Sequence, residues 1–83
     1  MKDFMRKVYA VADDQGAKRV TSVKVWIGAL AHMSADHFRE HFEQASAGGP
    51  AEGARIEATI DENIGDPDAQ HIRLESVEVE VDE

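Results

Sequence analysis

The fold of this chain is decided by the stretch Gly16-Ala-Lys-Arg-Val-Thr-Ser-Val-Lys-Val-Trp-Ile-Gly-Ala-Leu30. Its first glycine can end a helix in the left-handed conformation that most residues avoid. A strand follows over residues 20–28, because Val23, Val25 and Ile27 alternate onto one face and the run is rich in β-branched side chains. The stretch therefore predicts a helix before it, a strand within it and, after its last glycine, a second helix.

Helical periodicity is present on both sides of that strand. From Met1 to Gln15 apolar residues recur at three-and-four spacing, as in a helix with one buried stripe. No Ser, Thr, Asp or Asn precedes this pattern as a cap, so the helix looks cut short at its start. The second helix begins at the N-cap candidate Ser34 and ends at the glycines and proline of residues 48–50. Its expected core residues are Ala35, Phe38, Phe42 and Ala45.

Two further strands follow the second helix. Residues 55–61 alternate, with Ile56, Ala58 and Ile60 expected to point inward. An acidic loop over residues 61–68 then separates this strand from the last one. Its Asp, Asn, Gly and Pro residues are typical of a solvated turn.

The last strand, residues 72–81, changes phase along its length. Its apolar residues lie at even positions up to Leu74 and at odd positions from Val77 onward. A β-bulge near Glu75 and Ser76 would bring both halves onto one face. The alternative is that both faces of this strand are covered.

The order helix, strand, helix, strand, strand predicts a single α+β domain over residues 1–83, with two helices packed on one face of a three-stranded sheet. The last two strands are expected to form an antiparallel hairpin. Because the first strand reaches them through a helical crossover, at least one parallel pairing, and hence a mixed sheet, is expected.

Composition limits the class of protein. The chain has 83 residues, a formal net charge of −8 and no cysteine, which argues against nucleic-acid binding and against a disulfide or thiolate zinc site. No apolar run reaches the roughly 18 residues of a membrane span, so we expect a soluble, cytoplasmic protein. No catalytic nucleophile stands in a recognisable order and no glycine-rich phosphate loop occurs, so we expect a binding protein and not an enzyme.

Two histidines form the candidate metal site. His37 and His41 are four residues apart in the second predicted helix and project from one side of it, a spacing that can clamp a divalent transition metal. Two imidazoles leave a site incomplete, so a third ligand from His32 or from a neighbouring chain would be needed. The alternative is a pair of boundary histidines half covered by their neighbours.

Trp26 is the candidate partner-binding residue. It alternates with the inward residues of its strand and so points onto a sheet face otherwise lined by polar side chains such as Arg55 and Arg73. An exposed tryptophan there could anchor a partner or a second copy of the chain. The alternative is that arginine or lysine stems cover the ring in a cation–π arrangement.

The chain resembles the HypA/HybF family, the nickel metallochaperones that help mature nickel-iron hydrogenases. The resemblance is carried by residues 16–30, by Phe38 to Glu43 on the second helix, by residues 51–57 and by the last strand over residues 72–80. It implies a nickel-handling accessory protein for hydrogenase maturation. It also implies the hydrogenase large subunit and a maturation GTPase as partners.

Two family features have no counterpart in this sequence. Family members open with Met-His-Glu, whose histidine and nearby backbone nitrogens bind nickel, whereas this chain opens with Met1-Lys2-Asp3. The family also carries a zinc lobe with paired Cys-x-x-Cys motifs between its last two strands, where this chain has the short loop from Asp61 to Gln70, so no zinc is expected. We expect Met1 to correspond to an internal methionine of a longer product with a Met-His-Glu type start.

A second function is consistent with the same residues. It is a metal-free protein-interaction module that keeps the fold and docks or dimerises through the sheet face around Trp26. Because a missing first strand would leave a sheet edge unpaired, we also predict a homodimer that covers such an edge.

Overall fold

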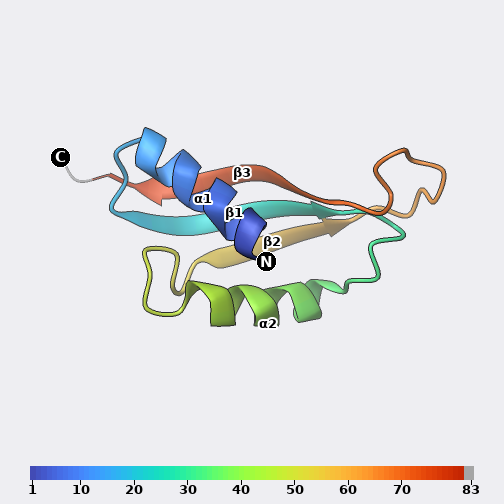
Figure 1. Cartoon of the computed structure of the whole chain (residues 1–83), viewed down its shortest axis with the longest axis horizontal. Helices are drawn as coiled ribbons and strands as arrows, with labels where there is room; N and C mark the ends of the chain where they lie inside the picture. Colours follow the sequence, from blue (N-terminus) through green and yellow to red (C-terminus); the bar gives the residue numbers. More distant parts are fainter. Residues whose placement is uncertain (82–83) are drawn as a thin grey trace.

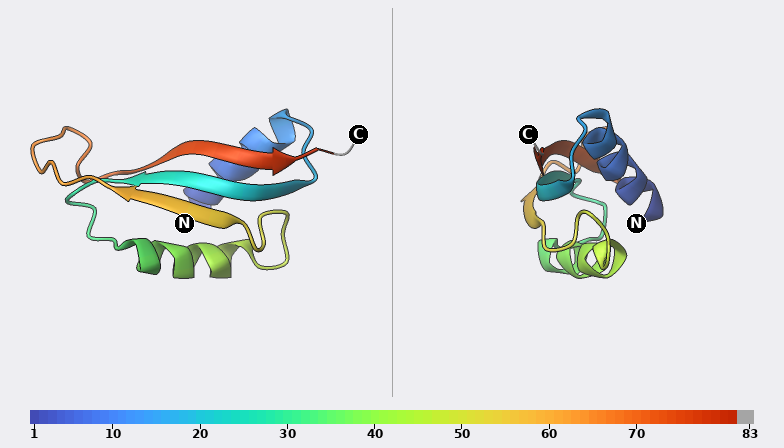
Figure 2. Two further views of the ribbon diagram at one scale, coloured as in Figure 1. Left: turned by 180° about the vertical axis from the view of Figure 1, so that it is seen from behind. Right: turned by 90° about the vertical axis from the view of Figure 1, so that its left-hand side faces the viewer.

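Five elements follow one another in the order expected from the sequence (Figure 1): α1 (Lys2–Asp14), β1 (Arg19–Ile27), α2 (Ala35–Ser46), β2 (Arg55–Ile60) and β3 (Ile72–Glu80). The structure is a computed structural model that describes residues 1–81. Seen end-on in Figure 2, both helices lie on the same side of the sheet, with α1 against β3 and β1 and with α2 beside β2. The predicted α+β class, with two helices and a three-stranded mixed sheet, is confirmed.

The sheet has the strand order β2-β1-β3, so β1 is the central strand. It runs parallel to β2, from the Ser22–Arg55 pair to the Ile27–Ile60 pair, and antiparallel to β3. The expected parallel pairing is therefore confirmed. The expected hairpin between the last two strands is wrong, because β1 separates them. The physical reason is that β1 buries side chains on both faces, and such a strand is best covered at the centre of a sheet.

The loop of residues 61–71 carries the chain past the end of β1 instead of turning back beside β2 (Figure 1). The Gly28 N–H donates to the His71 carbonyl at 2.9 Å, and the Leu30 N–H donates to the Ala69 carbonyl at 2.7 Å. These backbone hydrogen bonds tie the loop to the exit of β1, so β3 starts on the far side of that strand.

A β-bulge keeps the apolar residues of β3 on the helical side of the sheet. The successive pairs Lys24–Ser76 and Val25–Leu74 leave Glu75 without a partner. The bulge expected at this place is therefore confirmed, and the apolar residues on both sides of it contact the core. A second register shift, which the sequence analysis did not foresee, lies near the start of β1.

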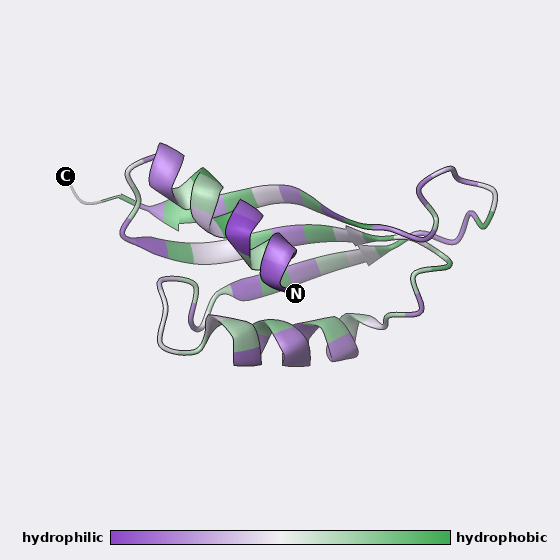
Figure 3. Ribbon diagram, in the orientation of Figure 1, coloured by the Kyte–Doolittle hydropathy of each residue, from purple (hydrophilic) through white to green (hydrophobic). Residues whose placement is uncertain are grey.

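The core lies between the sheet and the two helices. Its buried members are Met5, Val8, Ala12, Val20, Val23, Val25, Ile27, Phe38, Phe42, Ala51 and Ile56. Figure 3 shows the same division on α2, which is hydrophobic toward the sheet and hydrophilic on its outer side.

Two expected core positions are wrong. Ala45 is exposed, and Ser46, only 2% exposed, takes the buried place in the last turn of α2. The buried line of α2 runs through Phe42 to the residue four positions later, and the Ser46 hydroxyl donates to the Glu43 carbonyl at 3.4 Å. Ile60 is 49% exposed because it ends the edge strand β2, beyond the cover of the helices.

The helix ends follow from local residue types. Gly16 adopts a φ of 64°, which confirms the left-handed position expected after α1. At the other end of α1, Met1 stands at the N-cap position without a side-chain cap, as the sequence predicts. Within residues 1–81, no helix is long and apolar enough to cross a membrane.

Candidate functional site

Ser34 determines where α2 begins and so where its first side chains lie. Its hydroxyl oxygen accepts a hydrogen bond from the His37 N–H at 3.1 Å, as expected for an N-cap. Phe38 and Phe42, each 1% exposed, hold the rotation of the helix against the core. The exposed side chains of His37 and His41 therefore lie on a flank of α2 that faces solvent.

The two imidazoles of this flank point toward each other. Nε2 of His37 and Nε2 of His41 are 2.8 Å apart, and the ring centroids are 4.6 Å apart with an angle of 32° between the rings. One Nε2 carries a proton and donates it to the lone pair of the other. The predicted pair is thus brought together with two potential metal-binding nitrogens adjacent, and both residues are exposed.

A third protein ligand is not brought to the pair. His32, the third ligand expected from this chain, lies in the connection before α2 with a φ of 54° and an exposed side chain. In the part of the chain that the structure describes, no group of three or more His, Cys, Asp or Glu side chains is placed to hold a metal ion. The histidine pair would therefore supply two ligands of a bound ion, and other donors would have to fill its remaining coordination positions.

Glu40 flanks the histidine pair in the sequence and was not assigned to the predicted metal site. The order His37-Phe-Arg-Glu40-His41 matches the His-x-x-Glu-His pattern that presents two metal ligands on one helix. Asp36 is paired with Arg39, at 3.1 Å between Oδ1 and NH1, whereas Glu40 makes no ion pair with any residue from 1 to 81. The available carboxylate beside the histidines is therefore that of Glu40, one turn after His37.

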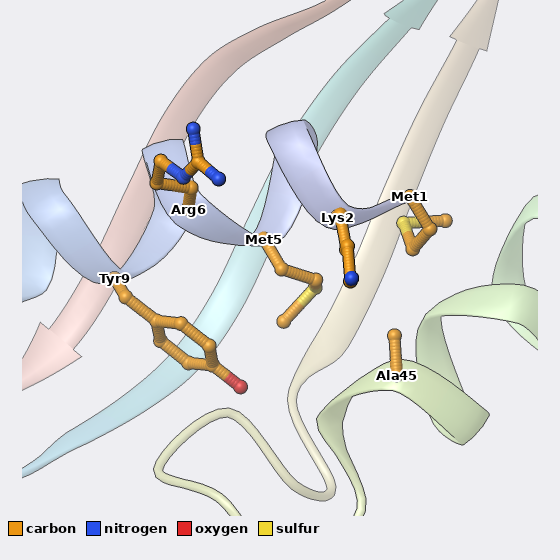
Figure 4. A pocket seen from close by; sticks show the side chains of 6 residues that line it. All are labelled: Met1, Lys2, Met5, Arg6, Tyr9 and Ala45. Carbon is orange, nitrogen blue, oxygen red and sulfur yellow. The ribbon is translucent and has the colours of Figure 1, made fainter.

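An open, largely apolar hollow of about 510 Å³ lies between α1 and α2 (Figure 4). Ala45, one turn after His41, borders it on α2. On α1 it is lined by Met1, Lys2, Met5, Arg6 and Tyr9. The histidine pair thus continues the row of α2 positions that borders the hollow.

Trp26 points onto the outer sheet face as expected, but it is not exposed. Its side chain is 8% exposed, and the Arg73 guanidinium carbon lies 4.1 Å from the ring centroid. Arg73 is itself held by Asp68, at 3.1 Å between NH1 and Oδ2. Arg73 reaches the ring because it pairs with Trp26 across the β1–β3 ladder. The covered alternative is the one found, and the role of Trp26 in binding a partner stays a prediction.

Replacing Arg73 by alanine is expected to expose the indole of Trp26. We expect a red shift of the tryptophan emission and a loss of at most about 1 kcal/mol in the free energy of unfolding, because cation–π contacts and exposed ion pairs are weak. Fluorescence and urea unfolding measure the two effects. Arg55→Ala on the same face is the matched control, and an emission maximum that moves no further in Arg73→Ala than in the control would contradict this assignment.

Comparison with known proteins identifies one informative relative. No protein-family model matches the sequence. Over 58 residues, which are 70% of this chain, the sequence is 37% identical to a protein named hydrogenase maturation factor HypA from Archaeoglobus fulgidus. Those residues cover 53% of that protein, so the chain spans about half the length of the relative that it matches. The chain is therefore similar to a HypA protein over most of its own length.

Proposed function

We propose that this chain is a HypA-like accessory protein in the maturation of nickel-iron hydrogenase and that nickel is its cargo. The observation that carries the proposal is the 37% identity, over 70% of the chain, to a protein named as a hydrogenase maturation factor. The family resemblance of residues 16–30 supplies the nickel-handling role. The same resemblance gives the partners that we propose: the hydrogenase large subunit and a maturation GTPase.

The proposed role is binding and transfer without catalysis. Within residues 1–81, the buried polar side chains are those of Ser22 and Ser46, and every ion pair joins exposed groups such as Lys24 and Glu57. A general acid or base is usually tuned by burial and by a charged neighbour. The solvated charges of this chain suit an accessory protein better than an enzyme.

The described residues bring together a pair of candidate nickel ligands, His37 and His41. Met1-Lys2-Asp3 does not match the Met-His-Glu opening of the family. The exposed imidazoles of His37 and His41 are the nitrogen donors that the described residues bring together. The covered ring of Trp26 gives the metal-free docking function no specific support.

Deletion of the gene in its own organism tests this function. We expect the hydrogenase large subunit to accumulate with little nickel, measured by elemental analysis of the purified subunit, and hydrogenase activity to fall with it. Expression of the full chain from a plasmid should restore both. A high nickel concentration in the medium should restore them in part, because mass action can replace assisted delivery. Unchanged nickel content in the deletion strain would overturn the proposal.

A further inference from the structure

We infer that His37 and His41 form a two-imidazole site for a divalent transition-metal ion of the nickel and copper class on the exposed flank of α2. As an account of how nickel is carried, the inference rests on the proposed function. The chemistry of the site rests on the two side chains alone. Nothing in the Met-His-Glu motif of the family corresponds to these positions.

The hydrogen-bonded spacing of the two nitrogens in the free pair lies close to the spacing that one class of coordination geometry requires. With metal–nitrogen bonds of about 2.0–2.1 Å, two ligands at a right angle stand about 2.9 Å apart and two ligands at a tetrahedral angle about 3.3 Å apart. The distance between Nε2 of His37 and Nε2 of His41 is 2.8 Å. It matches the right angle of square-planar and octahedral coordination, which nickel and copper adopt more readily than zinc.

Metal binding requires the lone pairs of both Nε2 atoms, whereas the hydrogen bond of the free pair uses one of these nitrogens as a donor. In the free protein one Nε2–H donates to the other Nε2. Both Nε2 lone pairs are needed for a metal ion, so the donating ring must carry its proton on Nδ1 instead. Both rings are exposed, and water can satisfy each Nδ1–H in the bound state.

The helix and its charges favour a cation at this place. The Ser34 cap and the buried Phe38 hold α2 in position, so the two rings are presented without further ordering of the backbone. Glu40 adds a negative charge one turn after His37 that no ion pair within residues 1–81 neutralises. The net charge of −8 attracts cations in general. The remaining coordination positions open to solvent, as exchange of a cargo ion requires.

Metal titration with matched histidine variants tests the site. Isothermal titration of the full chain with NiCl₂ is expected to show one ion per chain, and CuCl₂ is expected to bind more tightly than NiCl₂ or ZnCl₂. His37→Gln with His41→Gln is expected to weaken nickel binding roughly a hundredfold, because both imidazole donors and the advantage of their linkage are lost. Glutamine keeps the helix, and both positions are exposed, so the variant should fold.

The matched control removes the other two histidines. His32→Asn with His71→Gln changes the histidine count equally, and asparagine tolerates the left-handed conformation of residue 32. We expect this control to bind nickel as the parent chain does. Electron paramagnetic resonance of the copper complex should show two coupled nitrogens in the parent and the control. Nickel binding that is unchanged in the His37/His41 variant, or lost in the control, would overturn the site.

The site and the proposed function fail in different experiments. One outcome is that the hydrogenase of the deletion strain lacks nickel while the His37/His41 variant binds nickel as the parent does. This outcome would support the proposed function and overturn the proposed site. The opposite outcome is that the variant no longer binds nickel in the titration while the hydrogenase of the deletion strain contains its full amount of nickel. This outcome would support the proposed site and overturn the proposed function. Circular dichroism in the presence of a chelator checks that every variant is folded before it is titrated.

Discussion

Phe38→Ala is expected to lower the free energy of unfolding by about 3–5 kcal/mol, the usual cost of removing a buried ring. Phe38 is 1% exposed and belongs to the buried core between the helices and the sheet. Its ring meets that of Phe4 edge-on, with centroids 5.1 Å apart, and lies 6.4 Å from that of Phe42. Since a domain of this length has roughly 4–12 kcal/mol of stability, most of the margin would be lost. Urea unfolding followed by circular dichroism measures the change.

Phe4→Ala is the matched control for that loss. Phe4 lies only partly buried on α1, so its removal should cost clearly less than the removal of Phe38. The double variant should reveal a coupling of about 0.5–1.5 kcal/mol between the two rings, as aromatic pairs do in such cycles. Equal unfolding midpoints for Phe38→Ala and Phe4→Ala would show that Phe38 does not hold α1 and α2 together as we describe.

Gly28→Ala is expected to lower the free energy of unfolding by about 2–3 kcal/mol, because an added methyl group would overpack this site. A Cβ at Gly28 would approach the carbonyl groups of Ala69 and Asp68, with the Asp68 oxygen at 2.8 Å. Those atoms are backbone and cannot rotate away. The hydrogen bond from the Gly28 N–H to the His71 carbonyl would also be strained. Thermal and urea unfolding of the variant measure the cost.

Gly65→Ala is the control for the same substitution in the acidic loop. A Cβ at Gly65 would meet the Asn63 side-chain oxygen at 3.4 Å, an ordinary contact distance. We therefore expect a change within about 0.5 kcal/mol, as for other surface substitutions. If Gly28→Ala were as mild as Gly65→Ala, the loop of residues 61–71 would not be docked on the end of β1 in solution.

The local structure could be predicted because it depends on neighbours in the sequence. Three-and-four spacing marks both helices, Gly16 ends the first and Ser34 caps the second. The change of phase in the last strand predicts the bulge at Glu75, since a shift of the apolar residues from even to odd positions requires one extra residue in the strand. The order of the strands in the sheet could not be read in this way, because alternation shows which face is buried and not which strand lies alongside.

The candidate site also has features that the sequence predicts and features that depend on the tertiary structure. The spacing of His37 and His41 places them on one side of a helix whatever the fold around it. Their exposure and the 2.8 Å between their nitrogens depend on how the core rotates α2. The direction of Trp26 followed from alternation, but its cover by Arg73 depends on the register between β1 and β3.

The sequence by itself determined the order and type of the five elements, the α+β class, the helix ends and the presence of a histidine pair. These features follow from side-chain period and from backbone preferences within a few residues. Only the tertiary structure decided that β1 is central, that Ser46 and not Ala45 is buried, and that Trp26 is covered. Those outcomes depend on contacts between residues far apart in the chain, which are fixed when the helices and the sheet bury one common core.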